Sequence, residues 1–276
     1  MRAPAAGLLS RPTGRWRLFE FHESPWVPRA IGESVVEVLG LTMRLGGISA
    51  ALATPYRSLV TLSGARQGAR QVLELASGSG ETSTHLHALA RFDAGSDITL
   101  SLSDLTPRTE HWATLGERFS VPVCFVDVPV DATAVPAAIG AGRVWMLLNA
   151  FHHLEVDQAT AMLERAVQSG KGVFISENFG ASVLATLPCG VVGMLAALLN
   201  PLLTKRDRVL KASLTYLLPV IPLVVAWDGL VSAMRMHRPA DVRAMTARWP
   251  AWEWELRDFR YLLIGRGTVL VGRPRD

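Results

Sequence analysis

The chain has 276 residues, of which 49% are hydrophobic and 19% are charged, and its net charge is +4. This length suits one large or two small domains. Its basic residues are scattered rather than clustered, which argues against a nucleic-acid partner. Its two cysteines, Cys124 and Cys189, lack metal-ligand spacing, which argues against a disulfide framework or a zinc site. We expect Cys124 to lie inside a buried strand.

The N-terminal segment does not have the features of a secretion signal. Residues 1–10 are short and weakly apolar for this role, and arginines follow at positions 11, 15 and 17. We therefore expect a cytoplasmic protein. Residues 18–28 contain His22, Glu23 and Trp26 before a proline-bounded turn, and residues 29–63 carry apolar side chains at helical spacing. Gly46-Gly47 is expected to separate two helices. We predict an N-terminal helical cap over residues 1–65.

The stretch from residue 71 to residue 84 organises the rest of the chain. An apolar run from Gln71 to Leu75 is followed by the small residues of 76–80 and then by a periodic segment over 85–90. This order predicts a strand, a tight loop and a helix. Small residues allow the backbone to approach a ligand closely, and the helix start offers N–H groups to it.

This stretch resembles the first motif of the class I S-adenosylmethionine-dependent methyltransferases, which is acid-x-Gly-x-Gly-x-Gly. Glu74, Gly78 and Gly80 match the pattern, and Ala76 replaces the first glycine. A nicotinamide-binding motif would instead need glycine at Ser83. The resemblance implies that S-adenosylmethionine is the cofactor, and that Glu74, Ala76, Ser77, Gly78 and Gly80 form part of its site.

Three later strand ends add residues to this predicted site. Asp104 ends the next apolar run, about two dozen residues past the glycines, a distance at which a βαβ unit returns an acid to the cofactor. The resemblance implies that Asp104 holds the ribose and that Leu105 is also a cofactor-binding residue. It also implies that Asp127 and Val128 lie near the adenine, with Asp131 as the rival acid. Asn149 and Ala150 are expected beside the methionine half.

The remaining pattern completes a predicted α/β fold. Strands are expected over residues 143–150 and 172–177, a helix over 155–169, and a terminal hairpin from the runs 252–259 and 268–272. We predict a three-layer Rossmann-like fold. Its seven-stranded sheet would consist of five parallel βα units and a C-terminal antiparallel hairpin. The methyltransferase-like domain would span residues 66–276, with an apolar helical insert over 178–250.

The insert admits three interpretations. Residues 178–204 carry no charge, a basic cluster follows at 205–208, and residues 212–227 are again uncharged. The insert could be a lid that buries an apolar substrate, a membrane-surface element with its basic turn at the head groups, or, least favoured, a membrane-spanning hairpin. Peripheral membrane contact through residues 178–234 and a homodimer are both left open.

The expected chemistry is methyl transfer to a small, apolar acceptor that resembles a natural product or a lipid. Positioning of the two reactants accounts for most of the catalysis of such a displacement. A base is needed only when the acceptor loses a proton. His152 and His153 are the nearest candidate bases, and His22 is a further one. No metal motif such as His-Glu-x-x-His occurs in the sequence. The alternative is a protein that keeps the cofactor pocket but has a non-methylating or scaffold role, in association with a membrane.

Overall fold

The computed structural model describes residues 18–67, 71–90, 98–178, 183–204, 206–261 and 265–275. They belong to two compact units, each assembled from segments that are distant in the sequence. Unit 1 comprises residues 1–42 and 179–238, and unit 2 comprises residues 43–178 and 239–276. The limits of the two units differ from the predicted boundary at residue 65 between an N-terminal cap and a methyltransferase-like domain. The predicted domain boundaries stay a prediction.

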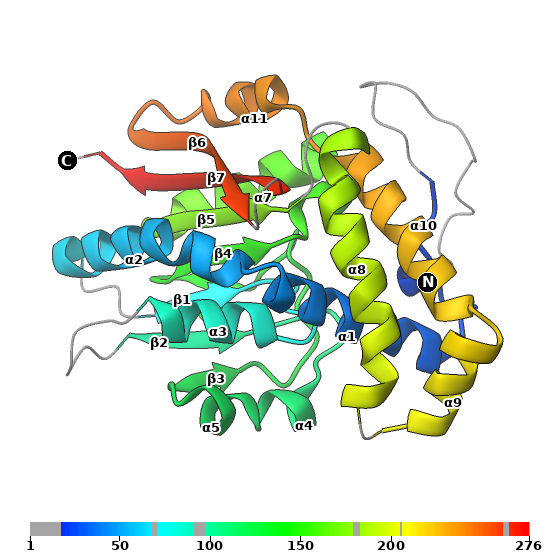
Figure 1. Cartoon of the computed structure of the whole chain (residues 1–276). Helices are drawn as coiled ribbons and strands as arrows, with labels where there is room; N and C mark the ends of the chain where they lie inside the picture. The colour runs from blue at the N-terminus through cyan, green and yellow to red at the C-terminus, as the bar shows by residue number, and fades with distance from the viewer. Residues whose placement is uncertain are drawn as a thin grey trace. The chain divides into compact units, whose positions relative to one another are not determined.

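Unit 2 is built on a seven-stranded sheet with the strand order β3-β2-β1-β4-β5-β7-β6 (Figure 1). Strands β1 to β5 are parallel, and β7 runs antiparallel to both β5 and β6. The predicted sheet of five parallel strands and a terminal hairpin is therefore confirmed. The strands are β1 (Gln71–Glu74), β2 (Thr99–Leu102), β3 (Val123–Phe125), β4 (Val144–Leu148), β5 (Gly172–Glu177), β6 (Trp252–Tyr261) and β7 (Gly265–Pro274).

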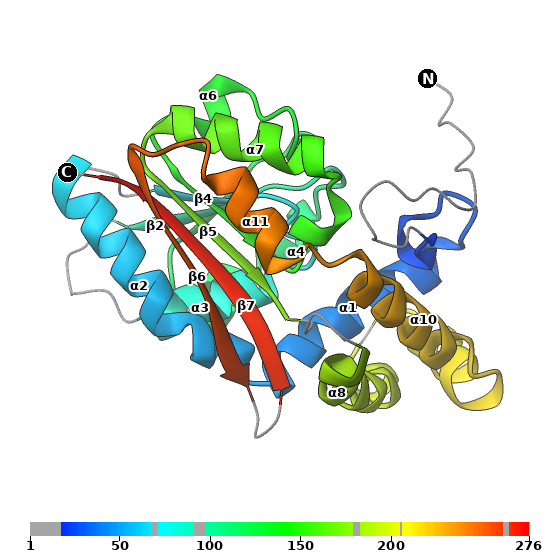
Figure 2. The ribbon, with the colours of Figure 1, turned by 90° about the horizontal axis from the view of Figure 1, so that it is seen from above.

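Helices cover both faces of this sheet (Figure 2). Helices α2 (Ile48–Gln67) and α3 (Glu81–Leu89) pack together on one face, and α7 (Val156–Ser169) and α11 (Pro239–Thr246) lie on the other. Gly47, with a φ of +67°, precedes α2, as expected from the Gly46-Gly47 pair. The shorter helices of unit 2 are α4 (Thr109–Trp112), α5 (Leu115–Phe119), α6 (Ala137–Gly140) and η2 (Phe151–His153).

The central strands are buried on both faces, which explains their nearly continuous apolar sequence. In β4, Trp145 and Leu147 join a core with the buried face of α7, while Val144 and Met146 are also fully buried. Strand β5 is buried at all six positions. Parallel strands that are sandwiched in this way have their carboxyl ends at one edge of the sheet, and loops after them can form a binding site there.

Strand β3 departs from the sequence prediction. It pairs only with β2 and ends the sheet, and its three residues are half-buried or exposed. Cys124 is consequently exposed rather than buried, so the expectation of a buried strand is wrong at this position. An edge strand has no second neighbour to cover it, and a short apolar run alone does not reveal this.

Unit 1 is helical. Residues Val38 and Leu41 pack against Ala196, Ala197 and Ile221 in a small apolar core. The elements are η1 (Phe21–Glu23), α1 (Arg29–Leu45, in unit 1 as far as Thr42), α8 (Val183–Leu203), α9 (Arg208–Ala212), the π-helical turn η3 (Ser213–Leu217) and α10 (Val220–Arg235). Helices α8 to α10 of the predicted insert therefore fold together with the N-terminal segment, which the sequence did not indicate, whereas α11 belongs to unit 2.

Among the described residues, the helices taken singly are too short or too polar to cross a membrane. Two bent pairs of helices pass the same test of length and composition when each pair is taken together.

Candidate active site

The loop after β1 has an unusual backbone. Ala76, Gly78 and Gly80 have φ values of +54°, +53° and +71°, and Gly80 caps α3. A left-handed conformation costs a residue with a side chain roughly 1–2 kcal/mol, so Ala76 carries strain that glycine would avoid. Strain of this kind is found at ligand-binding turns, where the surrounding structure imposes it. The loop thus turns sharply at the carboxyl end of β1, where the motif predicted it.

Gly80 is required by packing as well as by its backbone angle. A Cβ atom at this position would lie 2.6 Å from Leu102 Cδ1, 3.0 Å from Leu115 Cδ1 and 3.1 Å from Trp112 Cδ1. Since these side chains are buried, they have little room to shift. Substitution of Gly80 would therefore disturb the fold as well as any ligand.

Asp104 holds the glycine loop from the neighbouring strand. Gly78 N–H donates to Asp104 Oδ2 at 2.8 Å, and Thr106 N–H donates to Oδ1 at 2.8 Å. The adjacent Ser103 donates its hydroxyl to the carbonyl oxygen of Glu74 at 2.6 Å. The end of β2 thereby fixes the loop after β1. Asp104 is only half-buried, and a carboxylate oxygen can accept a second hydrogen bond.

Glu74 is a buried acid directly beneath the loop. Its Oε2 accepts a hydrogen bond of 2.5 Å from Ser83 Oγ at the start of α3. Burial raises the pKa of Glu74 to about 8, against opposing hydrogen bonds from Ser83 and Ser77, and the negative charge of Asp104 raises it further. Glu74 is therefore mostly protonated at neutral pH and links β1 to α3 without adding a charge beneath the loop.

The raised pKa makes stability depend on pH. An acid whose pKa is higher in the folded state stabilises the fold fully below its ordinary value of 4.5, and this contribution is lost as the pH rises through about 8. Glu74→Gln should remove the dependence, because glutamine keeps the shape of the neutral acid. The difference in free energy of unfolding between variant and wild type should shift in favour of the variant by a few kcal/mol from pH 5 to pH 8. It is measured by urea unfolding at both pH values. The exposed Glu110→Gln should show no such change, and equal effects of Glu74→Gln at both pH values would contradict the pKa shift.

The other predicted cofactor residues follow the neighbouring strands. Leu105, Asp127 and Val128 are exposed after β2 and β3. Backbone hydrogen bonds join the two loops, from Val126 N–H to Leu102 O and from Val130 N–H to Asp104 O, each of 2.9 Å. Because β3, β2, β1 and β4 are adjacent and parallel, these positions share one edge of the sheet with the glycine loop.

At the end of β4, Asn149 adopts a φ of +55°, which asparagine tolerates better than most residues. Its N–H donates to Ser176 O at 2.7 Å, and its side-chain oxygen accepts from Asn178 N–H at 3.2 Å. Ala150, which follows, is half-buried. These contacts bind the end of β4 to the end of β5 and set the direction of the next residues.

His152, which follows β4, is held by an acid at the end of β5. Its ring Nδ1 lies 2.7 Å from Glu177 Oε2, and its backbone N–H donates to Glu177 Oε1 at 3.0 Å. Burial raises the pKa of Glu177, but the charge of His152 and the hydrogen bonds from it, together with His153, outweigh burial and lower it. A carboxylate that holds one ring nitrogen orients a histidine for proton transfer at the other. The His153 ring centroid lies 4.2 Å from that of His152, but His153 is more exposed.

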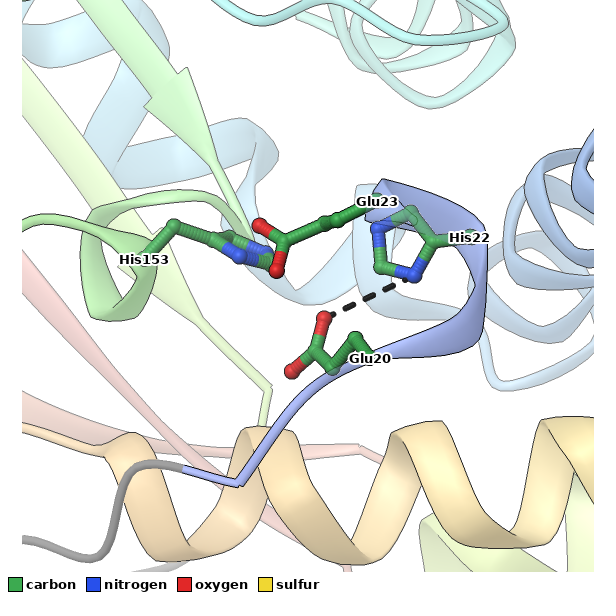
Figure 3. A group of neighbouring side chains, drawn as sticks. All are labelled: Glu20, His22, Glu23 and His153. Carbon is green, nitrogen blue, oxygen red and sulfur yellow. Dashed lines mark ion pairs between the residues drawn. The ribbon is translucent and has the colours of Figure 1, made fainter. Parts of the chain in front are cut away.

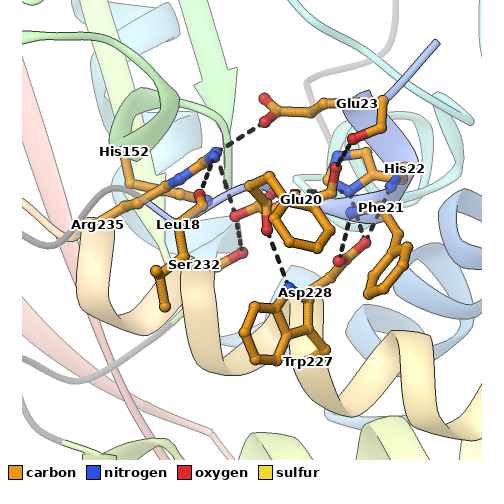
Figure 4. A network of polar contacts seen from close by, with 12 residues as sticks. Leu18, Glu20, Phe21, His22, Glu23, His152, Trp227, Asp228, Ser232 and Arg235 are labelled. Atoms are coloured by element: carbon orange, nitrogen blue, oxygen red, sulfur yellow. Dashed lines mark hydrogen bonds and ion pairs between the residues drawn. The ribbon is translucent and has the colours of Figure 1, made fainter. Parts of the chain in front are cut away.

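His22, the third predicted base, belongs to a polar network inside unit 1 (Figure 4). The backbone N–H groups of Phe21 and His22 donate to the Asp228 carboxylate at 2.7 and 3.1 Å, and the His22 ring Nδ1 lies 3.0 Å from it. Arg235 extends the network with a bond of 2.7 Å to Leu18 O. The network ties the segment before α1 to α10, so His22 has a structural role there and its catalytic role stays a prediction.

Glu20, His22 and Glu23 have their ionisable groups close together (Figure 3). Candidate ligand atoms on these side chains lie within 4.8 Å of one another, a spacing that a cation could bridge. Arg235 already supplies positive charge, at 2.8 Å from Glu23 and 3.3 Å from Glu20. Burial lowers the pKa of His22, but its hydrogen bond to Asp228 and the nearby carboxylates raise the pKa overall. Within unit 1 these ion pairs join the segment before α1 to α10.

Sequence reasoning missed Glu177 as a site residue. It identified Glu177 only as the last residue of a strand, although an acid at the carboxyl end of a parallel strand shares an edge with the glycine loop. It also missed Trp112, whose Nε1–H donates to Gly78 O at 3.1 Å and helps to hold the loop. No local pattern links Trp112 to a loop more than thirty residues earlier.

No protein-family model matches the chain, and no curated protein matches it in sequence. Solved structures with a similar fold include two methyltransferases. Magnesium protoporphyrin IX methyltransferase from Synechocystis PCC 6803, with bound SAH, is 13% identical over 82% of this chain and 84% of that chain, with a TM-score of 0.46. Human N-acetylserotonin methyltransferase, in complex with SAM, is 14% identical over 96% of this chain and 64% of that chain, with a TM-score of 0.49. Unit 2 has the class I methyltransferase fold, as its strand order shows.

Proposed function

We propose that the chain is an S-adenosylmethionine-dependent methyltransferase acting on a small, apolar acceptor that must lose a proton. One observation carries the proposal: the strained glycine loop, Asp104 and the His152–Glu177 pair all lie at the carboxyl ends of the parallel strands of one sheet. A ligand-binding loop and a histidine held by a carboxylate are the two parts that such a reaction needs.

The loop residues suit the cofactor. Gly78 and Gly80 carry no side chain at two of the three positions of positive φ in the loop, which lets the backbone turn tightly at the carboxyl end of β1. Asp104 can accept hydrogen bonds from ribose hydroxyls, and the exposed Leu105 and Val128 can cover the flat adenine with Asp127 near its amino group. Asn149 and Ala150 would border the methionine half. When bound, the cofactor supplies a methyl group activated by a sulfonium.

The His152–Glu177 pair would prepare the acceptor. Glu177 holds His152 Nδ1, so a proton from an acceptor hydroxyl would pass to Nε2. Glu177 then stabilises the imidazolium through the same contact. Loss of the proton makes the acceptor oxygen a better nucleophile for in-line attack on the methyl carbon. His153, which is beside His152 but more exposed, is the rival base.

The alternative is a protein that binds the cofactor without transferring its methyl group. Ala76 is the residue that favours it, because a methyl group stands where the motif has its first glycine. The two functions differ in their products. Only a methyltransferase forms S-adenosylhomocysteine in step with a methylated acceptor. A homodimer, which either function allows, also stays a prediction.

The proposal is tested by cofactor binding followed by label transfer. The full chain is titrated with S-adenosylmethionine and S-adenosylhomocysteine by calorimetry, and we expect micromolar affinity for both. It is then incubated with methyl-labelled S-adenosylmethionine and a panel of hydroxylated apolar compounds and lipid extracts. Label should enter an extractable product in equal amount with S-adenosylhomocysteine. A folded sample that binds neither nucleoside contradicts the cofactor site, and binding without transfer to any acceptor supports the alternative.

A further inference from the structure

Exposed apolar side chains are concentrated in one part of unit 1. Of the 19 large apolar side chains that are exposed among the described residues, 13 lie between Leu187 and Leu223. We call these 13 residues the apolar surface. They are Leu187, Val191, Leu195, Leu198, Leu199, Leu202, Leu203, Val209, Leu210, Tyr216, Leu217, Leu218 and Leu223. Monomeric soluble proteins rarely expose apolar side chains in such number on contiguous elements, so this surface indicates a partner.

Helix α8 has one face in the core of unit 1 and one face outside it. Ala196, Ala197 and Asn200 are buried, and the first two pack in the apolar core. Leu195 and Leu202 are 52% and 56% exposed and lie two helical turns apart on the same side. The outward leucines are therefore a continuous stripe and do not result from a poorly packed helix.

The elements that follow α8 are held in place by polar contacts. Lys211, which is buried, lies 2.8 Å from Glu37 Oε2 and 3.1 Å from Thr204 Oγ1, so α9 is tied to α1 and to the end of α8. Tyr216 donates its hydroxyl to Leu198 O at 2.5 Å and ties η3 to α8. These bonds keep Val209 and Leu217, which are 82% and 78% exposed, pointing outward from an ordered turn.

The charges at this surface are of one predominant sign. The sequence has no charged residue from 178 to 204. At the turn before α9, Arg206 and Arg208 are exposed, and Asp207 is the one acid between them. Lys211 is paired with Glu37, and Arg206 lies 3.8 Å from Asp207, so the exposed residues Arg206, Asp207 and Arg208 together leave one positive charge beside the apolar surface. Arginines beside an apolar face match the anionic head groups and acyl chains of a lipid surface.

The residue types also favour lipid over a protein partner. The apolar surface consists of ten leucines, two valines and one tyrosine. The centres of protein interfaces are enriched in aromatic residues, methionine and arginine, whereas leucine is common on helices that lie in a membrane interface. A tyrosine with a bonded hydroxyl suits the boundary between acyl chains and head groups.

We infer that unit 1 docks peripherally on an anionic lipid bilayer, with the apolar surface entering the acyl boundary and Arg206 and Arg208 at the head groups. The apolar helices lie along the interface in this arrangement. The inference does not depend on the proposed methyl transfer, because vesicle binding is measured without S-adenosylmethionine. It would also give the chain access to acceptors that are dissolved in the bilayer.

The test is flotation of the full chain with vesicles of phosphatidylcholine alone and of phosphatidylcholine mixed with phosphatidylglycerol. We expect the chain to float with the mixed vesicles and to bind the neutral ones more weakly. The double variant Leu195→Glu/Leu202→Glu should bind at least about tenfold more weakly, because two carboxylates would have to enter the acyl boundary. Arg206→Gln/Arg208→Gln should bind more weakly to the anionic vesicles only.

Controls separate docking from misfolding and from self-association. Leu45→Glu changes an exposed leucine outside the apolar surface and should leave flotation unchanged. Urea unfolding of the double variant should match that of the wild type, since its changes are at exposed positions. Three results would overturn the inference. The chain could bind neither vesicle type, or it could bind equally well after both leucines are replaced. It could also form a stable dimer in light scattering that covers the apolar surface.

Discussion

Replacing His152 with alanine should reduce the rate of methyl transfer by about 10²–10⁴-fold, the usual contribution of a positioned general base. The affinity for S-adenosylmethionine should stay within about twofold, because His152 lies on η2 after β4, while the glycine loop is held by Asp104 and Ser103. The prediction rests on the 2.7 Å contact between His152 Nδ1 and Glu177, which sets the orientation of the ring. Turnover and KM for the labelled acceptor are measured in parallel with calorimetric titration of the cofactor.

Two further variants distinguish the base from its neighbours. Glu177→Gln should lower kcat about as much as His152→Ala, because one amide oxygen cannot accept from both the backbone N–H and the ring Nδ1–H of His152, so the ring is held in the wrong tautomer and loses the carboxylate that stabilises the imidazolium. His153→Gln should leave kcat within a few-fold of the wild type if His152 is the base. A large loss in His153→Gln together with near-normal turnover in His152→Ala would assign the base to His153. Equal losses of cofactor affinity in all three variants would mean that this region binds the cofactor and transfers no proton.

The sheet and its glycine loop could be predicted because their signals are local. An apolar run, small residues and a helical period follow one another within about fifteen residues, and the strand order then follows from the βα pattern. The site at the carboxyl ends of the strands follows from this topology. The partner of His152 could not be predicted in the same way. His152 and Glu177 are 25 residues apart, and the register of β4 and β5 brings them together.

Unit 1 shows a second reason why part of the fold could not be predicted from the sequence. The backbone of Phe21 bonds to Asp228 across 207 residues of sequence, and no periodicity connects the two segments. The sequence pattern therefore predicted an N-terminal cap and a separate insert. In the structure, most of the insert folds together with the N-terminal segment. The apolar insert had the composition of both a buried lid and a membrane element. In the structure, Ala196 is buried and Leu195 is exposed on the same helix, so the two faces of α8 differ in a way that the composition of the insert does not reveal.

Replacing Asp104 with asparagine should weaken binding of both S-adenosylmethionine and S-adenosylhomocysteine by about 10-fold to 100-fold, the loss expected when a charged acceptor of hydrogen bonds is removed from a partly buried site. Two causes combine. The ribose hydroxyls lose a carboxylate, and the Gly78 and Thr106 N–H groups, each 2.8 Å from one of its oxygens, compete for the single remaining carbonyl. The loss is measured by calorimetry at one pH and salt concentration, with urea unfolding of the same samples to exclude a general loss of the fold.

Asp157→Asn is the matched control for Asp104→Asn, since Asp157 is an exposed acid in the first turn of α7, outside the predicted cofactor residues. It should bind both nucleosides as the wild type does. Asp127→Asn tests the adenine side and should cost less than Asp104→Asn, because Asp127 is exposed and would make one contact rather than two. Unchanged affinity in Asp104→Asn would mean that the carboxylate only shapes the loop, and the ribose would then have to be held elsewhere. A larger loss in Asp127→Asn than in Asp104→Asn would move the charged contact from β2 to β3.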